Sequence, residues 1–297
     1  MKYQLRDYQK KASDAAVMCF KMKSGRNGLL VLPTGAGKSL IIADIAARLE
    51  EPLIVFQPNK EILEQNFAKL QTYGIWDCSI YSASVGRKEI SRITFATIGS
   101  VIRHMKDFQH FKNILIDECH LVKPSDGMYK RFFEQAERRI VGLTATPYRL
   151  YSCMNGSMLK FLTRTRPRVF SQVLYYCQVS ELLAKGFLSR LKYYDVTRID
   201  LTKVRRNSSG ADFDDASLSD EFRRVDLYGY LISIVKRLLH PKVGGARKGM
   251  LVFTRFTAEA EMLAREIPDS AVVSADTTKS DRERIPVSYT HLTLPTT

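Results

Sequence analysis

Eight consecutive residues decide how the first part of this chain is expected to fold: Leu32-Pro33-Thr34-Gly35-Ala36-Gly37-Lys38-Ser39. A short apolar run precedes them and a second one follows, an order that predicts a strand, a glycine-rich turn and a helix. Gly35 and Gly37 allow a tight turn whose N–H groups face one anion, and the helix adds its positive N-terminal end. The stretch therefore predicts a phosphate-binding loop, in which Lys38 reaches the β- and γ-phosphates and Ser39 ligates Mg²⁺.

A second motif places two acids where this loop needs them. Residues 113–120, with the sequence NILIDECH, are an apolar strand that ends in Asp117 and Glu118. In a parallel sheet this puts the carboxylates at the carboxyl edge, where α/β folds bind ligands. We expect Asp117 to hold Mg²⁺ and Glu118 to orient or deprotonate the attacking water.

The two motifs together resemble those of superfamily 2 helicases. The P-T-G-x-G-K-S form, in which Leu32 stands where the general loop pattern has Gly, is the variant used in that superfamily, and D-E-C-H at 117–120 is similar to its DEAD/DEAH box. The chain most resembles bacterial DNA helicases of the RadD or type III restriction-subunit kind. This resemblance implies an α/β fold with two RecA-like P-loop lobes that close over ATP and Mg²⁺.

Sequence before the loop resembles the adenine-contacting element of DNA-directed superfamily 2 motors. The pattern L-R-x-Y-Q spans residues 5–9, and the resemblance implies that Gln9 and Arg6 contact the adenine. The start of an ordinary amphipathic helix is the alternative. The residues expected to bind the nucleotide are Arg6, Gln9, Pro33, Thr34, Gly35, Ala36, Gly37, Lys38 and Ser39.

Further motifs suggest how nucleotide and nucleic acid are linked. T-A-T-P-Y-R at 144–149 resembles motif III, which implies that Thr144 and Thr146 couple the two sites, with His120 as their counterpart. Turn formation before Pro147 is the alternative explanation of these threonines. Strand ends that resemble motifs Ia and Ib suggest contacts to a nucleic-acid backbone, although helix capping explains Asn59 and Thr97 equally well. The expected contacts are Pro58, Asn59, Thr97, Gly99 and Ser100.

Strands alternate with helices in the first part of the chain, which predicts a parallel sheet with helices on both faces. We expect this first lobe to span residues 1–165. Residues 166–286 are expected to begin an incomplete second lobe, with a polar insertion near 198–220 and a motif-IV-like strand at 248–255. Residues 287–297 resemble a translated sequencing adaptor and are excluded from the fold. Because no Q-x-x-G-R-x-x-R motif is present, we expect poor hydrolysis by this chain alone.

Composition narrows the class of partner. The chain has 297 residues, and its 46 Lys and Arg outnumber 31 Asp and Glu, which gives a formal charge of +15. This excess favours a polyanionic partner, and a basic protein with no such partner is the alternative. No apolar run has the length of a membrane helix and no signal-peptide core is present, so we expect a cytoplasmic protein without a membrane partner. The five Cys lack CxxC spacing and indicate neither zinc nor disulfides.

The sequence therefore favours an ATP-dependent DNA helicase or translocase that uses Mg²⁺ and acts on single- or double-stranded DNA in repair, recombination or defence. One alternative is an ATP-gated nucleic-acid clamp, or a restriction-system motor subunit that does not unwind strands. An RNA helicase of the DEAD-box kind is less favoured, because D-E-C-H and T-A-T stand where that group has D-E-A-D and S-A-T. A small-molecule kinase would leave the D-E-C-H and T-A-T-P motifs unexplained.

Overall fold

A computed structural model describes residues 4–22, 26–153, 156–190, 198–208, 210, 212–242, 244, 250–278, 280–282 and 284–285. The chain divides into two compact units, Met1–Lys192 and Tyr193–Thr297.

An eight-stranded sheet forms the centre of the first unit, with strand order β10-β1-β7-β6-β2-β5-β3-β4. All neighbouring strands are parallel except β3 and β4. This confirms the predicted α/β fold with a mostly parallel sheet. The strands are β1 Gly28–Val31, β2 Leu53–Phe56, β3 Cys78–Ser82, β4 Arg87–Lys88, β5 Ile93–Ala96, β6 Asn113–Ile116, β7 Arg139–Thr144 and β10 Gln172–Tyr176.

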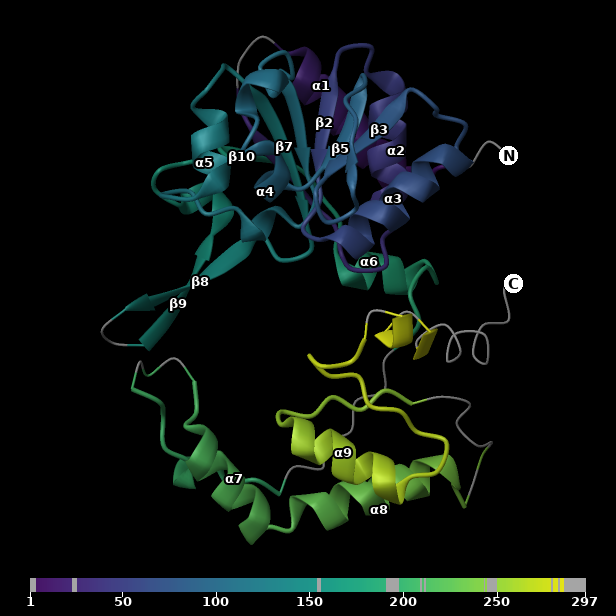
Figure 1. Cartoon of the computed structure of the whole chain (residues 1–297), viewed down its shortest axis with the longest axis vertical. Coiled ribbons are helices and arrows are strands. Elements are labelled where there is room, and N and C mark those ends of the chain that lie inside the picture. Colours follow the sequence, from purple (N-terminus) through teal and green to yellow (C-terminus); the bar gives the residue numbers. More distant parts are fainter. Residues whose placement is uncertain are drawn as a thin grey trace. The chain divides into compact units, whose positions relative to one another are not determined.

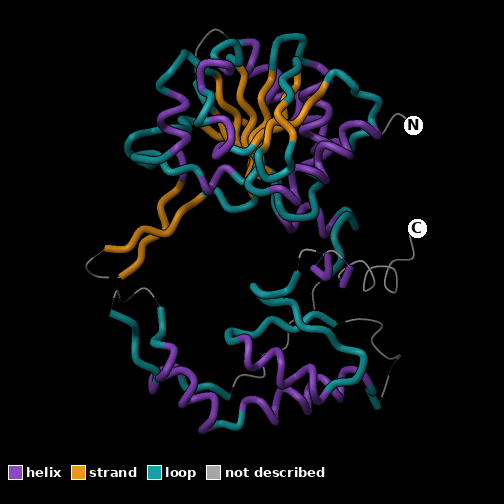
Figure 2. Tube along the Cα trace, viewed as in Figure 1, coloured by secondary structure: helices purple, strands orange, loops and turns teal. Residues whose placement is uncertain are grey.

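Helices cover both faces of this sheet (Figures 1 and 2). One apolar core joins the sheet to α1, α2 and α3, and the other joins its opposite face to α4, α5 and the 3₁₀ turn η1. The strands β2, β5 and β6 are buried at every residue, which explains their continuous apolar sequences. The helical elements are α1 Asp7–Lys21, α2 Lys38–Arg48, α3 Lys60–Thr72, α4 Ile98–Val101, α5 Met128–Phe133, α6 Val179–Ala184, η1 Met105–Phe108, η2 Cys119–Leu121 and η3 Leu162–Arg164.

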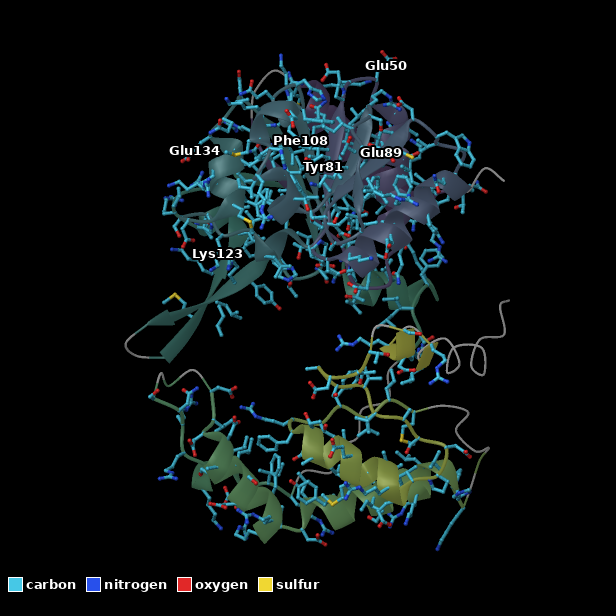
Figure 3. The ribbon with its side chains drawn as sticks, viewed as in Figure 1. Glu50, Tyr81, Glu89, Phe108, Lys123 and Glu134 are labelled. Carbon is cyan, nitrogen blue, oxygen red and sulfur yellow. The ribbon has the colours of Figure 1, made fainter. Side chains whose placement is uncertain are left out.

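Aromatic rings fill the second of these cores. The rings of Tyr81 and Phe108 meet edge to face with centroids 4.8 Å apart. Both side chains lie inside the unit, whereas Glu50, Glu89 and Glu134 lie at its periphery (Figure 3). This packing fixes η1 against β3 and completes the side of the sheet opposite to α1 and α2.

The register of the strands brings the functional motifs to one edge. Val31 at the end of β1 pairs with Thr144 at the end of β7. Ile116 at the end of β6 pairs with Phe56 at the end of β2. The loops that follow β1, β2, β6 and β7 therefore leave the sheet together, as the sequence predicts for a parallel sheet.

A separate antiparallel hairpin follows β7. It comprises β8 Tyr148–Cys153 and β9 Gly156–Phe161 and extends away from the main sheet (Figure 2). Leu150 and Leu159 pair across it, and each side chain is 61% exposed. The sequence analysis predicts no hairpin here, because a hairpin with exposed apolar side chains lacks the pattern of a buried strand.

The first unit also extends beyond the boundary at residue 165 that the sequence suggested. β10 adds a parallel strand beside β1, and Gly28 pairs with Gln172. Asn27 holds this connection in place, because its side chain donates to the Val169 carbonyl while its own carbonyl accepts from the Ser171 N–H. The unit therefore includes the edge strand β10 and the helix α6 that follows it.

The second unit is helical where the structure describes it. Its helices are α7 Asp215–Arg224, α8 Leu227–Leu239 and α9 Thr257–Glu266, with a 3₁₀ turn, η4, at Leu201–Lys203. Asp226 separates α7 from α8: it has φ 46° and caps α8. The polar insertion that the sequence predicts near 198–220 contains η4 and the start of α7.

The motif-IV-like strand that the sequence predicts in the second unit, at 248–255, is not formed among the described residues of that segment. Leu251 and Phe253 are 68% and 92% exposed, so this apolar segment has no sheet to join. One short strand does not make a stable sheet by itself, since stability requires further strands or covering helices. The second RecA-like lobe therefore stays a prediction, and residues 287–297 lie outside the described residues.

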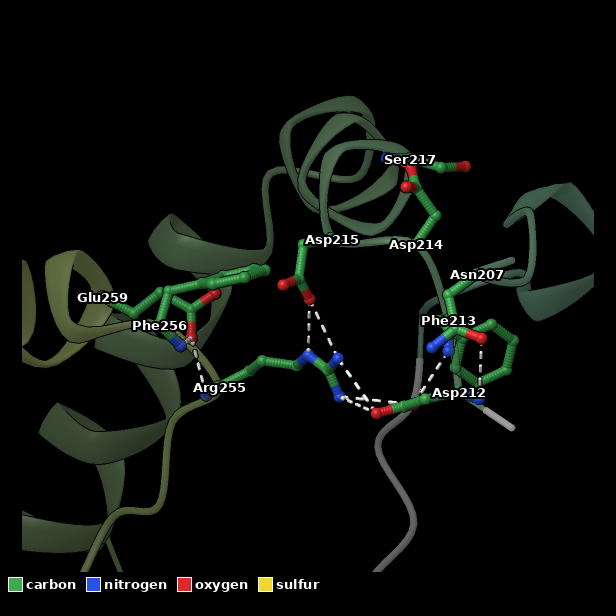
Figure 4. A network of polar contacts seen from close by, with 9 residues as sticks. All are labelled: Asn207, Asp212, Phe213, Asp214, Asp215, Ser217, Arg255, Phe256 and Glu259. Carbon is green, nitrogen blue, oxygen red and sulfur yellow. Dashed lines mark hydrogen bonds and ion pairs between the residues drawn. The ribbon is translucent and has the colours of Figure 1, made fainter. Parts of the chain in front are cut away.

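Charged side chains join the helical segments of this unit (Figure 4). The Arg255 guanidinium contacts Asp212 at 3.1 Å and Asp215 at 2.9 Å. The buried Glu259 carboxylate accepts from the backbone N–H of Arg255 at 3.1 Å and from that of Phe256 at 3.3 Å. These contacts fix the start of α9 against Asp212, which precedes α7, and against Asp215, the first residue of α7. No described helix in either unit has the length and apolar character needed to cross a bilayer.

Candidate active site

The glycine-rich loop has the backbone that its sequence predicts. Gly35 and Gly37 have φ values of 82° and 75°, and Gly37 is the N-cap of α2. A Cβ atom at Gly37 would lie 2.6 Å from the Gln9 amide nitrogen, and one at Gly35 would lie 2.9 Å from Leu188. The positive φ values strain any larger side chain at both positions, and the loop leads directly into the N-terminus of α2.

Lys38 at the start of α2 forms an ion pair with Glu118. The Lys38 Nζ atom lies 2.5 Å from Oε1 of Glu118, and both side chains are mostly buried. Glu118 has φ 47°, a left-handed conformation that is costly for a side chain with a Cβ atom. Its second carboxylate oxygen lies 3.4 Å from Nδ1 of His120. The predicted phosphate-binding lysine and the predicted water-activating acid therefore meet directly.

Asp117 lies beside this pair and is only 5% exposed. Burial raises the pKa of its carboxyl group, and the positive charge of Lys38 partly opposes that shift. Its Oδ1 atom accepts from the Glu118 N–H at 3.0 Å, and its own N–H donates to the Phe56 carbonyl at the end of β2. The carboxylate is therefore fixed and poorly solvated, an environment that a bound cation would stabilise.

The two expected magnesium ligands meet through a third side chain. The Ser39 hydroxyl donates to Oδ1 of Asn66 at 2.5 Å, and Nδ2 of Asn66 lies 3.3 Å from Oδ2 of Asp117. The described residues contain no cluster of three or more His, Cys, Asp or Glu side chains that could hold a metal alone. Mg²⁺ commonly takes one or two protein oxygens, with phosphates and waters as the remaining ligands, so Ser39 and Asp117 fit this cation.

The residues predicted to couple the two sites also lie together. Nδ1 of His120 lies 3.0 Å from the hydroxyl of the buried Thr144. The same hydroxyl accepts from the Thr146 N–H at 3.0 Å, so it also shapes the turn before Pro147. The Thr144 carbonyl accepts from the Leu32 N–H at 3.0 Å. Thr144 thus contacts both the D-E-C-H segment and the start of the phosphate loop.

Helix α1 fixes the phosphate loop from the other side. Gln9 is 3% exposed, accepts from the Arg6 N–H at 2.9 Å and donates to the Ala36 carbonyl at 2.9 Å. The hydroxyl of Tyr8 donates to the same carbonyl at 3.0 Å. The guanidinium of Arg6 lies 4.0 Å from the ring centroid of Phe187. The predicted adenine contacts therefore adjoin the loop, and Gln9 supports its backbone.

A hollow of about 420 Å³ lies in the first unit beside the starts of α3 and α4. All five residues expected to contact nucleic acid line it, and four basic side chains surround them. The Asn59 side chain caps α3 by accepting from the Ile62 N–H, whereas the Thr97 side chain caps no helix and instead shares a hydrogen bond with Ser100. The lining residues are Pro58, Asn59, Lys60, Ala83, Ser84, Lys88, Thr97, Gly99, Ser100, Arg103 and His104.

Three residues beside the phosphate loop and the expected magnesium ligands were not predicted from the sequence. Asn66 is buried within α3, a place where Asn is unfavourable unless its amide has partners, and that mismatch was the available signal. Phe187 and Leu188 follow α6 and contact Arg6 and Gly35. Nothing in the sequence indicates that these two residues return to the phosphate loop, because their position depends on β10 joining the sheet.

Comparison with known proteins finds one matching family and several relatives. Residues 2–149 match the family described as "Type III restriction enzyme, res subunit". A relative named DNA 3′-5′ helicase XPB from Kineococcus radiotolerans is 25% identical, and the alignment covers 97% of this chain and 49% of the relative. The protein of the same name from Mycobacterium tuberculosis is 24% identical over 95% of this chain and 49% of its own length. The chain thus spans about half the length of these relatives.

Other similarities cover a smaller part of the chain. DNA 3′-5′ translocase XPB2 from Sulfurisphaera tokodaii is 29% identical over 50% of this chain and 32% of its own length. Among solved structures, the UvsW helicase of bacteriophage T4 aligns with a TM-score of 0.40 and 22% identity over 49% of this chain and 54% of that chain. With its phosphate loop, its D-E-C-H box and the family match over residues 2–149, the chain is similar to superfamily 2 DNA helicases of the type III restriction-subunit kind.

Proposed function

We propose that this chain provides the ATP-binding lobe of a DNA helicase or translocase that couples ATP hydrolysis to movement on DNA. The observation that carries the proposal is the direct contact between Lys38 and Glu118 beside the buried Asp117, at the edge of the sheet. A phosphate-binding lysine, a metal-binding acid and a water-activating acid are the groups that phosphoryl transfer to water needs.

Each side chain then has a separate role. ATP phosphates bind the N–H groups of the glycine loop and Lys38, so they compete with Glu118 for the ammonium group. Once it is released, the Glu118 carboxylate can accept a proton from the attacking water. Ser39 and Asp117 would hold Mg²⁺, which neutralises charge on the phosphates when it is bound. Gln9 and Arg6 face the adenine in this proposal.

DNA is the proposed partner, and the hollow beside α3 and α4 is its proposed contact in this lobe. Lys88 and Arg103 are exposed there, and the hydroxyl and amide groups of Thr97, Ser100 and Asn59 can donate to phosphates. The formal charge of +15 supports a polyanionic partner. Repair, recombination or defence is the proposed process, and Thr144 and Thr146 with His120 would connect nucleotide state to DNA.

The first test measures ATP hydrolysis by the whole chain with and without DNA. The proposal expects a slow rate that DNA raises and that Lys38→Ala abolishes. Equal rates for both proteins, with and without DNA, would contradict it. Stimulation by RNA but not by DNA would instead support the RNA-helicase alternative.

A second candidate is an ATP-gated clamp or a restriction-system motor subunit that does not unwind strands. The match to the type III restriction res subunit family favours keeping this candidate. Strand-displacement and translocation assays separate it from the main proposal. ATP-dependent DNA binding without displacement or movement would support a clamp, whereas movement without displacement would support a translocating subunit.

A further inference from the structure

We propose that Asn66 positions the two magnesium ligands, Ser39 and Asp117, and connects them through α3 to the hollow proposed to bind DNA. The inference rests on the proposed function, because it assigns a role at the same site. Asn66 is a positioning residue in this proposal: it acts through the ligands and not on the reacting atoms. The sequence motifs assign it no role.

The hydrogen bonds of Asn66 are complementary to those two ligands. Its Oδ1 atom accepts the Ser39 proton at 2.5 Å, and its Nδ2 atom faces Asp117 Oδ2 at 3.3 Å and Gln57 Oε1 at 3.1 Å. A hydroxyl has one proton to donate and two lone pairs to offer. Because Asn66 takes the proton, the lone pairs of Ser39 are left for a cation.

The orientation of the Asn66 amide follows from its neighbours. Reversing it would bring Oδ1 against the Asp117 carboxylate, an acceptor against an acceptor, and would leave Nδ2 facing Ser39. Asp117 lies in a buried environment, where such a mismatch is expensive. Gln57 presents its oxygen to Asn66 and leaves its own Nε2 atom buried and without a partner in the described part of the chain. In the orientation in which Gln57 Oε1 accepts from Asn66, the Gln57 side chain therefore makes one hydrogen bond fewer.

The same helix leads to the hollow. Residue Asn59 caps α3, Lys60 begins it, and both line the hollow. Asn66 is six residues beyond Lys60 in the same helix. Gln57 directly follows Phe56, the last residue of β2, and precedes Pro58, which also lines the hollow. A shift at the start of α3 is therefore carried to Asn66 along the helix and to Gln57 through the short segment 58–59, and from them to the magnesium ligands.

The test measures how binding of a fluorescent ADP analogue depends on Mg²⁺ concentration, so it does not require turnover. Side chains that orient metal ligands typically change metal affinity by about 10- to 100-fold when removed. We expect Asn66→Ala to raise the Mg²⁺ midpoint by a factor in this range and to leave metal-free nucleotide affinity unchanged. Gln57→Ala should shift the midpoint in the same direction by less.

Asn113→Ala provides a matched control. Asn113 is also a fully buried Asn of this lobe, but it starts β6 and contacts Glu51 instead of the phosphate loop. The Asn113→Ala substitution should lower thermal stability without moving the Mg²⁺ midpoint. A wild-type midpoint for Asn66→Ala, or equal shifts for Asn66→Ala and Asn113→Ala, overturns the positioning role.

Adding DNA tests the connection to the hollow. We expect single-stranded DNA to move the Mg²⁺ midpoint of the wild-type protein and to leave that of Asn66→Ala unmoved. No effect of DNA on the wild-type midpoint, or the same effect on both proteins, overturns the connection. If the wild-type protein binds no nucleotide, the proposed function fails, whereas Mg²⁺-dependent wild-type binding that Asn66→Ala does not alter removes this inference alone.

Discussion

Nζ of Lys38 lies 2.5 Å from Oε1 of Glu118, across the gap between the phosphate loop and the end of β6. The two side chains neutralise each other at the place where ATP phosphates would bind. The same contact occupies Oε1 of Glu118, while its Oε2 atom lies 3.4 Å from Nδ1 of His120. In the proposed mechanism, nucleotide binding and activation of the acid are linked, because the phosphates must displace the carboxylate from the lysine before it can act on water.

Glu118→Gln should separate binding from hydrolysis. The amide keeps the shape of the side chain but cannot take a proton, and loss of a general base typically slows a reaction by about 10²- to 10⁴-fold. Nucleotide affinity should not fall, since Lys38 no longer has a charged competitor. Single-turnover hydrolysis and equilibrium binding measure the two effects, and an unchanged hydrolysis rate would remove Glu118 from the proposed mechanism.

Thr144→Val should uncouple DNA from ATP hydrolysis. Valine preserves the shape but removes the hydroxyl that contacts His120 and accepts from the Thr146 N–H. We expect nucleotide binding to persist and stimulation by DNA to fall, with about 1–3 kcal/mol of stability lost for the unpaired N–H group. Thr72→Val, at the exposed end of α3, is the control. Full DNA stimulation in Thr144→Val would contradict the coupling role.

Arg103→Ala should weaken DNA binding in a salt-dependent way. The side chain is exposed at the rim of the hollow beside α4. If it contacts one phosphate, its removal lowers the slope of log affinity against log salt by about 1 for duplex DNA. Fluorescence anisotropy at several salt concentrations measures that slope. Arg131→Ala, on the exposed face of α5, serves for comparison, and equal slopes for the two variants would move the DNA contact elsewhere.

The second unit should lose stability in acid through Glu221. Its side-chain hydrogen bonds to Arg224, together with the N–H of Asp200, lower its pKa from 4.5 to about 2. A carboxyl whose pKa falls on folding stabilises the fold above pH 4.5 and loses that contribution as pH drops toward 2. The free energy of unfolding, measured with urea between these pH values, should depend less on pH in Glu221→Gln than in the wild-type protein. Glu134→Gln, in the first unit, should leave this pH dependence unchanged. If the free energy of unfolding of Glu221→Gln fell with pH as steeply as that of the wild-type protein, groups other than Glu221 would account for the loss of stability in acid.

Much of the first unit could be predicted from sequence because its signals are local. The apolar runs of β1, β2 and β6 and the loop around Gly37 each depend on neighbouring residues in the chain. Parallel pairing then brings the strand ends together without further information. For the same reason the contact between the Asp117–His120 segment and Thr144 could be anticipated before the structure.

Contacts between distant segments could not be predicted in this way. Asn66 is polar within a helix, and only the tertiary fold shows that Ser39 and Asp117 are its partners. Phe187 reaches Arg6 only because β10 joins the sheet beside β1. In the second unit, the apolar segment around Phe253 has strand-like sequence, but it remains exposed because strand formation depends on neighbours that local pattern does not supply.

The most direct test of the account is Mg²⁺-dependent binding of a fluorescent ATP analogue to the wild-type chain, to Lys38→Ala and to Lys69→Ala. Lys69 is an exposed lysine in the last turn of α3 and controls for the loss of a positive charge. We predict saturable binding to the wild-type protein and to Lys69→Ala, and severe loss of binding in Lys38→Ala. Equal binding to all three proteins would contradict the claim that the loop ending at Lys38 and Ser39 binds the phosphates of ATP.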